Sequence, residues 1–262
     1  VVITGQTASL APMDKQIYAL RDVTGTVSSV PLIATSIMSK KIAGGADKIL
    51  IDIKVGNGAL LPTKKQAEEL SSLVKKIGKI YQKDVHTIIS DMNVPLGYCV
   101  GNSLEVMEAI QVLKGEETGT NLTKLCIDLA SEMVCMAKDV LPQDAQDMVL
   151  QAISSGAAYQ KFVELVKAQH GDLTHLPLSK KIKTIKASKS GTIEKISAIE
   201  VGELSVSLGA GRLTKEDSIN PGVGVQLLKQ VGDVVKKGEP LAKVYYSKTP
   251  HLQDFNDIFL IK

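Results

Sequence analysis

Three side chains near the start of the sequence have the right types and spacing to bind a flat, polar ring. Ser36 and Lys40 are four residues apart in a stretch with helical spacing, so they share one face of the expected helix. Arg21 precedes them by a short connection, 22–29, that contains a glycine and could fold two helices back on each other. A guanidinium, a hydroxyl and an ammonium suit a heterocycle with adjacent carbonyl and imide groups, such as a pyrimidine base.

The same residues also have a purely structural interpretation. Lysines in the last turn of a helix commonly complement its dipole, and a helix serine is usually only solvated. Arginine usage favours a functional role, because Arg21 and Arg212 are the only arginines among 31 basic residues, and arginine suits planar, bidentate contacts. For Arg212 we expect a structural role, fixing the turn at 207–212 or a sheet edge.

The elements that must position these residues follow from the periodicity of apolar side chains. Helices are predicted at 13–20, 31–42 and 63–82, from about residue 102, and between 122 and about 170. Strands are predicted at 48–55 and 85–92. Residues 1–5 are predicted to be the later part of a further short strand. Because the strands at 48–55 and 85–92 flank a long helix, we expect a parallel crossover between them.

A second, β-rich unit is expected after residues 170–181, where short strands and glycine turns replace long helices. Its stretch 231–244 has a hairpin pattern that resembles half of a biotinyl or lipoyl carrier domain. The predicted fold class is therefore α/β, with a parallel-sheet lobe, a small helical-lobe segment and a barrel-sandwich-like β unit. The expected divisions are a strand and hinge at 1–12, the helical-lobe segment carrying the base site at 13–45, the α/β domain at 46–178, and the C-terminal β-rich domain at 179–262.

Composition narrows the class of protein. The 262 residues are 44% hydrophobic, enough for a substantial core, and no apolar run reaches the roughly 18 residues that span a bilayer. The net charge is +3, without a basic tail or aromatic-rich basic stripe, so we expect neither nucleic-acid nor membrane partners. Three cysteines without a C-x-x-C pair suit reduced thiols in a cytoplasm. The sequence begins without Met or a signal-peptide pattern, and we expect a fragment.

Two segments carry a resemblance to a known family. The stretch "GQTASLAPMDKQIYALRDVTGTVSSVPLIATSIMSKKIAGGADKILIDIKVGNGAL", residues 5–60, closely resembles the thymidine and pyrimidine-nucleoside phosphorylases, and "SDMNVPLGYCVGNSLEVMEAI", residues 90–110, continues the match. The resemblance extends through the C-terminal unit. It implies that Arg21 of "LRDVT", and Ser36 and Lys40 of "SIMSKK", bind the base. It also implies that Val27 and Ile33 line the base pocket, although both suit the core of the helix pair equally well.

The resemblance implies an activity and its reactants. Such enzymes are pentosyltransferases of nucleoside salvage that catalyse reversible phosphorolysis of uridine, thymidine or deoxyuridine, giving free base and α-(deoxy)ribose 1-phosphate. Inorganic phosphate is the co-substrate, no organic cofactor is expected, and family members are homodimers. The phosphate-binding residues and a histidine near the base would precede residue 1, so we expect the chain alone to be inactive. Gly56-Asn57-Gly58 is too weak a signal for a phosphate loop.

The resemblance also implies a potassium-like ion held by the backbone carbonyls of Leu96 and Cys99 and by Glu108. Oxygen ligands suit such a hard cation, whereas the alternative is that Glu108 only solvates a helix face. The four histidines have no spacing typical of a metal site or triad, and none is predicted to be catalytic.

Other functions remain as alternatives. A biotinyl or lipoyl-like carrier would need a modifiable lysine in a Met-Lys-Met or Asp-Lys-Ala setting, and neither tripeptide occurs. A structural module is a further alternative. An anthranilate-type phosphoribosyltransferase shares the fold but would not explain Arg21, Ser36 and Lys40 together.

Overall fold

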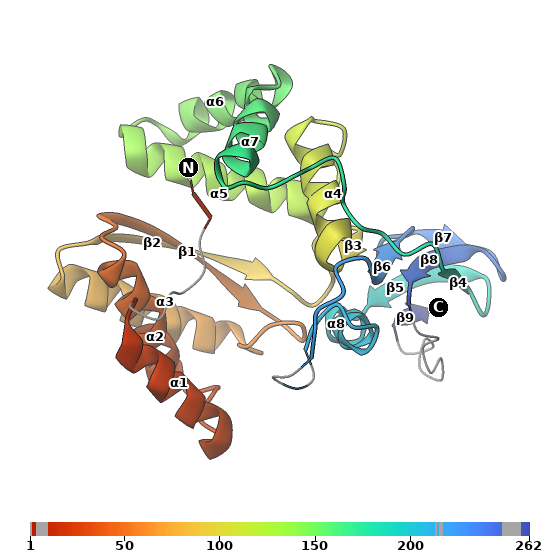
Figure 1. Ribbon diagram of the computed structural model, residues 1–262, viewed down its shortest axis with the longest axis horizontal. Helices are drawn as coiled ribbons and strands as arrows, with labels where there is room; N and C mark the ends of the chain where they lie inside the picture. Colours follow the sequence, from red (N-terminus) through yellow and green to blue (C-terminus); the bar gives the residue numbers. More distant parts are fainter. Residues whose placement is uncertain (1, 4–9, 213, 215–216, 248–257) are drawn as a thin grey trace. The chain divides into compact units, whose positions relative to one another are not determined.

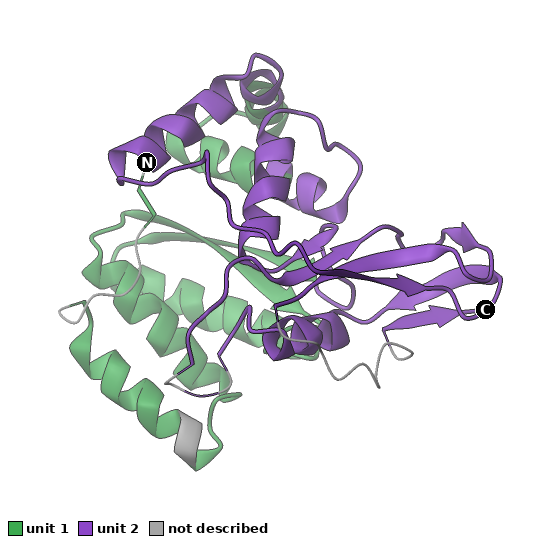
Figure 2. Cartoon of the chain, turned by 45° about the vertical axis from the view of Figure 1, so that its right-hand side comes forward, with its two compact units in different colours: residues 1–91, 128–149 green, residues 92–127, 150–262 purple. Residues whose placement is uncertain are grey.

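The computed structural model describes residues 2–3, 10–212, 214, 217–247 and 258–262 (Figure 1). The strand predicted at 1–5 falls largely outside the described residues, as does His251. The chain forms two compact units, 1–91 with 128–149 and 92–127 with 150–262 (Figure 2). Each unit contains its own cluster of buried hydrophobic side chains.

Two helices open the described part of the first unit. α1 spans Pro12–Thr24 and α2 spans Val30–Ala43, which confirms both predicted helices and lengthens the first by one turn. α1 ends at Gly25, whose left-handed backbone (φ 66°) lets its N–H bond to the carbonyl of Arg21. α2 opens with a proline in its first turn, where the missing N–H costs no helical hydrogen bond.

A parallel strand pair forms the centre of the first unit. β1 (Lys48–Val55) pairs in parallel with β2 (Asp84–Asp91), and α3 (Lys64–Ile80) connects them, so the predicted crossover is confirmed. One face of β1 is apolar, and its isoleucines pack into the core together with residues of α2 and α3. Each fully buried isoleucine contributes about 1.5–3 kcal/mol of transfer free energy.

Three further helices were predicted as one long helical region. They are α5 (Asn121–Lys138), α6 (Pro142–Ser154) and α7 (Ala157–Ala168), and the division between the two units runs through α5 and α6. Within the first unit, α5 lies beside the strand pair. Lys48 donates to the carbonyl of Met136, and His86 Nδ1 on β2 bonds to Glu132 while its Nε2 lies 3.2 Å from Asp84.

The second unit is built on two antiparallel sheets. One has the strand order β3-β6-β8-β4 and the other β7-β5-β9, with buried valines and isoleucines of both in one core. Their bounds are β3 Cys99–Val100, β4 Ile182–Lys186, β5 Gly191–Ile196, β6 Gly224–Leu227, β7 Val234–Val235, β8 Pro240–Tyr245 and β9 Phe259–Ile261. The helix expected from about residue 102 is α4, Asn102–Leu113.

Two details of this unit differ from the sequence prediction. The hairpin predicted at 231–244 is wrong, because β7 pairs with β5 whereas β8 pairs with β4 and β6. The turn between β7 and β8 carries the chain from one sheet to the other. The second difference is a helix, α8 (Ala198–Ser207), which interrupts the strands of a region that was predicted to lack long helices.

Among the residues that the structure describes, no helix combines the length and the apolar composition needed to cross a membrane. The mixed α/β architecture, with a parallel pair and two antiparallel sheets, confirms the predicted fold class.

Candidate functional site

Lys40 is the centre of a polar cluster between α1 and α2. Its Nζ donates to Ser36 Oγ at 2.9 Å, as expected for residues one helical turn apart. The same Nζ lies 2.7 Å from Oδ2 of Asp14, which belongs to the first turn of α1. Asp14 is 8% exposed, and the side chain of Lys40 is 28% exposed, so the ammonium keeps access to solvent while the carboxylate is buried.

The ionised form of Asp14 is stabilised by its neighbours. Burial acts to raise the pKa of this carboxyl, but hydrogen bonds from Lys40 and Ser36, and the positive charges of Lys40 and Arg21, act in the other direction. Together they outweigh burial, and the pKa of Asp14 lies below its ordinary value of 3.8. The carboxylate therefore remains charged at neutral pH and holds the ammonium of Lys40 in place.

Arg21 lies on α1 and closes the connection to α2. Its guanidinium donates to the carbonyl of Val27, and at 3.4 Å to those of Thr26 and Leu32. It is 3% exposed and also lies over the ring of Tyr18, 5.2 Å from the ring centroid. A lysine has one nitrogen and could not reach three carbonyls with one planar group, which explains an arginine at this position.

The predicted base-binding residues are connected partly by direct contact and partly through Asp14. Ser36 and Lys40 touch directly, whereas Arg21 has no hydrogen bond to either of them among the described residues. The charge of Arg21 acts on Asp14, and Asp14 contacts Lys40. Arg21 thus shares the cluster through the carboxylate and shapes the turn in front of it.

The two predicted pocket-wall residues have different surroundings. Ile33 is 5% exposed and belongs to the core cluster shared with α3 and β1. Val27 is half-buried in the α1–α2 connection, and its carbonyl accepts the Arg21 hydrogen bond.

Asp14 is the member of the cluster that sequence reasoning missed. The signal was present in the spacing, because Asp14 and Arg21 are seven residues apart and therefore lie on one face of α1, two turns from each other. That face meets the Ser36 and Lys40 face of α2. With two cations and one anion, the cluster has an excess of one positive charge, which suits an electron-rich, planar ligand.

Comparisons with known proteins bear on this cluster. Residues 1–159 match the glycosyl transferase family, a/b domain, and residues 192–258 match the pyrimidine nucleoside phosphorylase C-terminal domain. The chain is also 46% identical over 98% of its length to a pyrimidine-nucleoside phosphorylase of Staphylococcus aureus strain bovine RF122 / ET3-1. A pyrimidine-nucleoside phosphorylase of S. aureus strain USA300 is 45% identical over the same share. The chain belongs to the pyrimidine-nucleoside phosphorylase family.

The match is long but does not include the whole of those relatives. The chain spans 60% of the length of the two S. aureus phosphorylases, while almost all of its own residues are matched. The a/b-domain match contains the cluster of Asp14, Arg21, Ser36 and Lys40, and the C-terminal match contains most of the β-rich region. Neither match favours a carrier module or a phosphoribosyltransferase.

The residues that the family resemblance assigned to a cation lie in the second unit. Glu108 on α4 is 3% exposed, and its carboxylate accepts hydrogen bonds from the N–H of Tyr98 at 2.5 Å and of Cys99 at 3.1 Å. The carbonyl of Leu96 accepts from Leu122 N at 2.8 Å. The turn approaches so closely that a Cβ on Gly97 would be 2.5 Å from the carboxylate.

The electrostatics of this turn suit a cation. Burial raises the pKa of Glu108, the two backbone N–H groups lower it, and the negative charges of Glu117 and Glu105 raise it, so that the net pKa is above the ordinary 4.5. A carboxylate with four lone pairs still has acceptor capacity after two N–H bonds. The remaining oxygen lone pairs of Glu108 are ligands of the type that a hard cation prefers. In the described part of the chain, no group of three or more His, Cys, Asp or Glu side chains could hold a metal ion.

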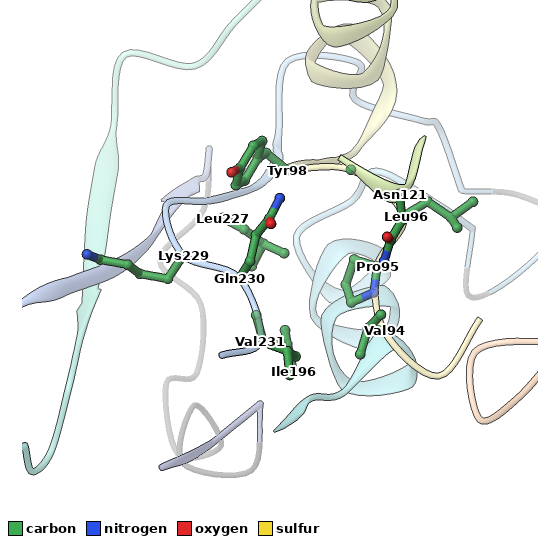
Figure 3. A pocket seen from close by; sticks show the side chains of 11 residues that line it. Val94, Pro95, Leu96, Tyr98, Asn121, Ile196, Leu227, Lys229, Gln230 and Val231 are labelled. Carbon is green, nitrogen blue, oxygen red and sulfur yellow. The ribbon is translucent and has the colours of Figure 1, made fainter. Parts of the chain in front are cut away.

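A cavity of about 160 Å³ lies beside the same turn (Figure 3). Residues 94–98 form one wall, and Asn121, Ile196 and the segment 227–231 form the others. The amide of Gln230 points toward Tyr98, whereas Lys229 extends away, and its Nζ lies 2.6 Å from Glu239 (Figure 3). One side of the turn at Leu96 therefore faces a cavity within the second unit, and polar residues such as Asn121 and Gln230 contribute to the lining of that cavity.

Proposed function

We propose that this chain forms part of a pyrimidine-nucleoside phosphorylase that catalyses reversible phosphorolysis of uridine, thymidine or deoxyuridine. The products are the free base and α-(deoxy)ribose 1-phosphate, with inorganic phosphate as co-substrate. The observation that carries the proposal is the cluster of Ser36, Lys40 and Arg21 around Asp14, in a chain whose family acts on pyrimidine nucleosides. The alternatives of a carrier and a phosphoribosyltransferase lack such an observation.

The cluster has the chemistry that departure of a pyrimidine requires. When the bond between the sugar and the base breaks, negative charge develops on the carbonyl oxygens of the base. Lys40 and Arg21 supply the positive charge that meets it, and the Ser36 hydroxyl binds the imide edge of the ring. Asp14 pairs with Lys40 and orients its ammonium, so the donors are positioned before the substrate arrives.

The neighbouring apolar residues have a part in this proposal. Val27 and Ile33 form walls against the faces of the ring, Val27 from the α1–α2 connection and Ile33 from the first turn of α2. Ile33 also belongs to the core of the first unit. It would therefore form a wall of the pocket and also anchor that wall to the core.

Several broader features belong to the same proposal. The helical segment 13–45 would carry the base site, 46–178 the α/β domain and 179–262 the β-rich domain. The carbonyls of Leu96 and Cys99 and the Glu108 carboxylate would hold a potassium ion, whose positive charge would stabilise the turn in front of α4. The working enzyme would be a cytoplasmic homodimer without an organic cofactor.

Direct binding of the base tests the proposal on the chain itself. Titration calorimetry with uracil and thymine should give binding, and anthranilate should give none. Lys40→Met removes a charged hydrogen bond worth about 1.5–3 kcal/mol and should weaken binding at least tenfold. Lys41→Met, next to it in the same last turn, is the matched control and should bind as the wild type does. Binding of anthranilate in preference to uracil would contradict the proposal.

Turnover provides the second test. Each donor to the developing charge is expected to contribute on the order of 3 kcal/mol, so Arg21→Lys should lower the rate of uracil release about a hundredfold in an enzyme of the full family length. If that variant retained wild-type turnover, the assigned role of Arg21 would be wrong. The 262 residues alone should release no uracil from uridine and phosphate, and release by them would contradict the expectation that they are inactive.

A further inference from the structure

One side of the β-rich region ends in two strand edges. β4 is the last strand of its sheet and has β8 as its one strand neighbour within the described ranges. β9 is the last strand of the other sheet and pairs with β5. Such edges present backbone N–H and C=O groups on which a further strand can form.

A groove lies between these two edges. It has a volume of about 440 Å³ and is lined by residues of β4 and β9, by Leu241 of β8 and by the segment that follows β4. Its polar side is formed by Thr184, Lys186 and Ser188, all exposed. Its apolar side is formed by Phe259 and Ile261, which are 8% and 5% exposed. The groove thus offers a row of polar groups above an apolar floor.

The charged side chains of β4 and of the residues just before and after it are all positive. The ten residues 180–189 contain five lysines and no acidic residue, and every one of those lysines is exposed. β8 adds Lys243 opposite Thr184 and likewise contains no acidic residue. This charge attracts an anionic partner.

We propose that the edge of β4 binds an extended, acidic segment of a partner protein by β-strand addition. Backbone groups of the segment would pair with the edge of β4 that faces away from β8. Its alternate side chains would point to opposite sides, apolar ones toward Phe259 and Ile261 and acidic ones toward the lysines of 180–189. Because the groove has a positively charged side and an apolar side, it suits a partner strand in which acidic and apolar residues alternate.

Lysines on edge strands also have a protective role, since they keep sheets of different molecules from pairing. Protection needs charge alone, whereas strand addition needs charge, a free backbone edge and an apolar floor in register. The two roles differ in what the edge binds, so an experiment with chosen peptides separates them.

Fluorescence anisotropy with a labelled eight-residue peptide of alternating glutamate and valine tests the proposal. The peptide should bind, and hydrogen exchange should slow in the amides of β4. A peptide of the same charge with prolines at alternate positions lacks the N–H groups and should bind at least tenfold more weakly. The double variant Lys186→Glu and Lys189→Glu should reduce binding of the alternating peptide more than tenfold. Lys79→Glu on α3, with the same type of charge reversal, should not.

Two results would overturn the proposal. If the proline peptide, polyglutamate or a single-stranded oligonucleotide bound as well as the alternating peptide, without slower exchange in β4, the lysines would form a general anion-binding surface. If no anionic ligand bound, the lysines would serve only to protect the edge. Because Lys186 and Lys189 are exposed, circular dichroism should show that the variant is folded.

Discussion

Asp14 is the residue whose replacement most directly tests how the polar cluster is held together. Asp14→Asn retains the shape of the side chain but removes its charge, so the ion pair with Lys40 at 2.7 Å becomes an ordinary hydrogen bond. Ser36 and Arg21 also lose the negative charge that they stabilise. We expect the contact between α1 and α2 to weaken, while the cores of both units remain intact.

The size of the effect follows from burial. Hydrogen bonds to charged groups contribute about 1.5–3 kcal/mol, and the lower end applies because the side chain of Lys40 is 28% exposed and partly screened by water. A loss of about 1.5 kcal/mol corresponds to slightly more than a tenfold change in an equilibrium constant. Opening of the α1–α2 pair should therefore become about tenfold more frequent in Asp14→Asn.

Hydrogen exchange measured by mass spectrometry is the suitable assay, because two compact units need not unfold together. Peptides from 12–43 should exchange about tenfold faster in Asp14→Asn, and peptides from β6 and β8 should be unchanged. The pKa of Asp14 lies below 3.8, so its stabilisation is complete above that pH and is lost as the pH falls through the folded-state pKa. The difference between the proteins should be full at about pH 7 and disappear at strongly acidic pH.

Asp47→Asn provides the matched control. Asp47 also pairs with a lysine, Lys83, at 2.9 Å, but its side chain is 91% exposed, and exposed pairs contribute little to stability. If Asp14→Asn accelerated exchange in 12–43 no more than Asp47→Asn does, the cluster would not hold the two helices together. The same conclusion would follow if the effect of Asp14→Asn were independent of pH.

Two further predictions concern packing and thiol reactivity. Gly78→Ala should lower the melting temperature, because the new Cβ would overlap Val85, whereas Gly202→Ala on α8 meets no atom within 4 Å and should raise it slightly; differential scanning calorimetry compares them. Burial first, and then nearby carboxylates, raise the pKa of Cys99 to about 12, so at about pH 8 iodoacetamide should alkylate exposed Cys126 well before Cys99. Mass spectrometry of the alkylated peptides measures this order, and equal rates would contradict it.

The first unit was largely predictable because its signals are local. The strand predicted at 48–55 has the observed bounds of β1, since alternating β-branched residues run up to the Gly56 turn. The contact between Ser36 and Lys40 follows from helical spacing alone. The role of Asp14 was not predictable in the same way, because it depends on the angle between α1 and α2, which the Arg21 hydrogen bonds to the connecting segment help to fix.

The sequence predicts that the C-terminal β-rich region contains short strands, but it does not predict which strands pair with each other. The pattern at 231–244 is typical of a hairpin, yet β7 and β8 belong to different sheets, because their partners lie far away in sequence. Packing of side chains across neighbouring strands decides between such pairings, and a short stretch of sequence contains no sign of which distant strand will be the neighbour. For the same reason, no local pattern predicts that β3, at 99–100, joins this sheet.

The origin of β3 has a consequence for how this molecule can be divided. Its two residues precede α4, but they complete the sheet beside β6, which lies within the matched C-terminal domain. A gene segment beginning at 179 would encode six of the seven strands described in these two sheets but not β3, leaving one side of β6 bare and open to pairing with other molecules. Grafting or exchanging the β-rich module between proteins therefore requires transferring the short 99–100 segment with it, or supplying a replacement strand.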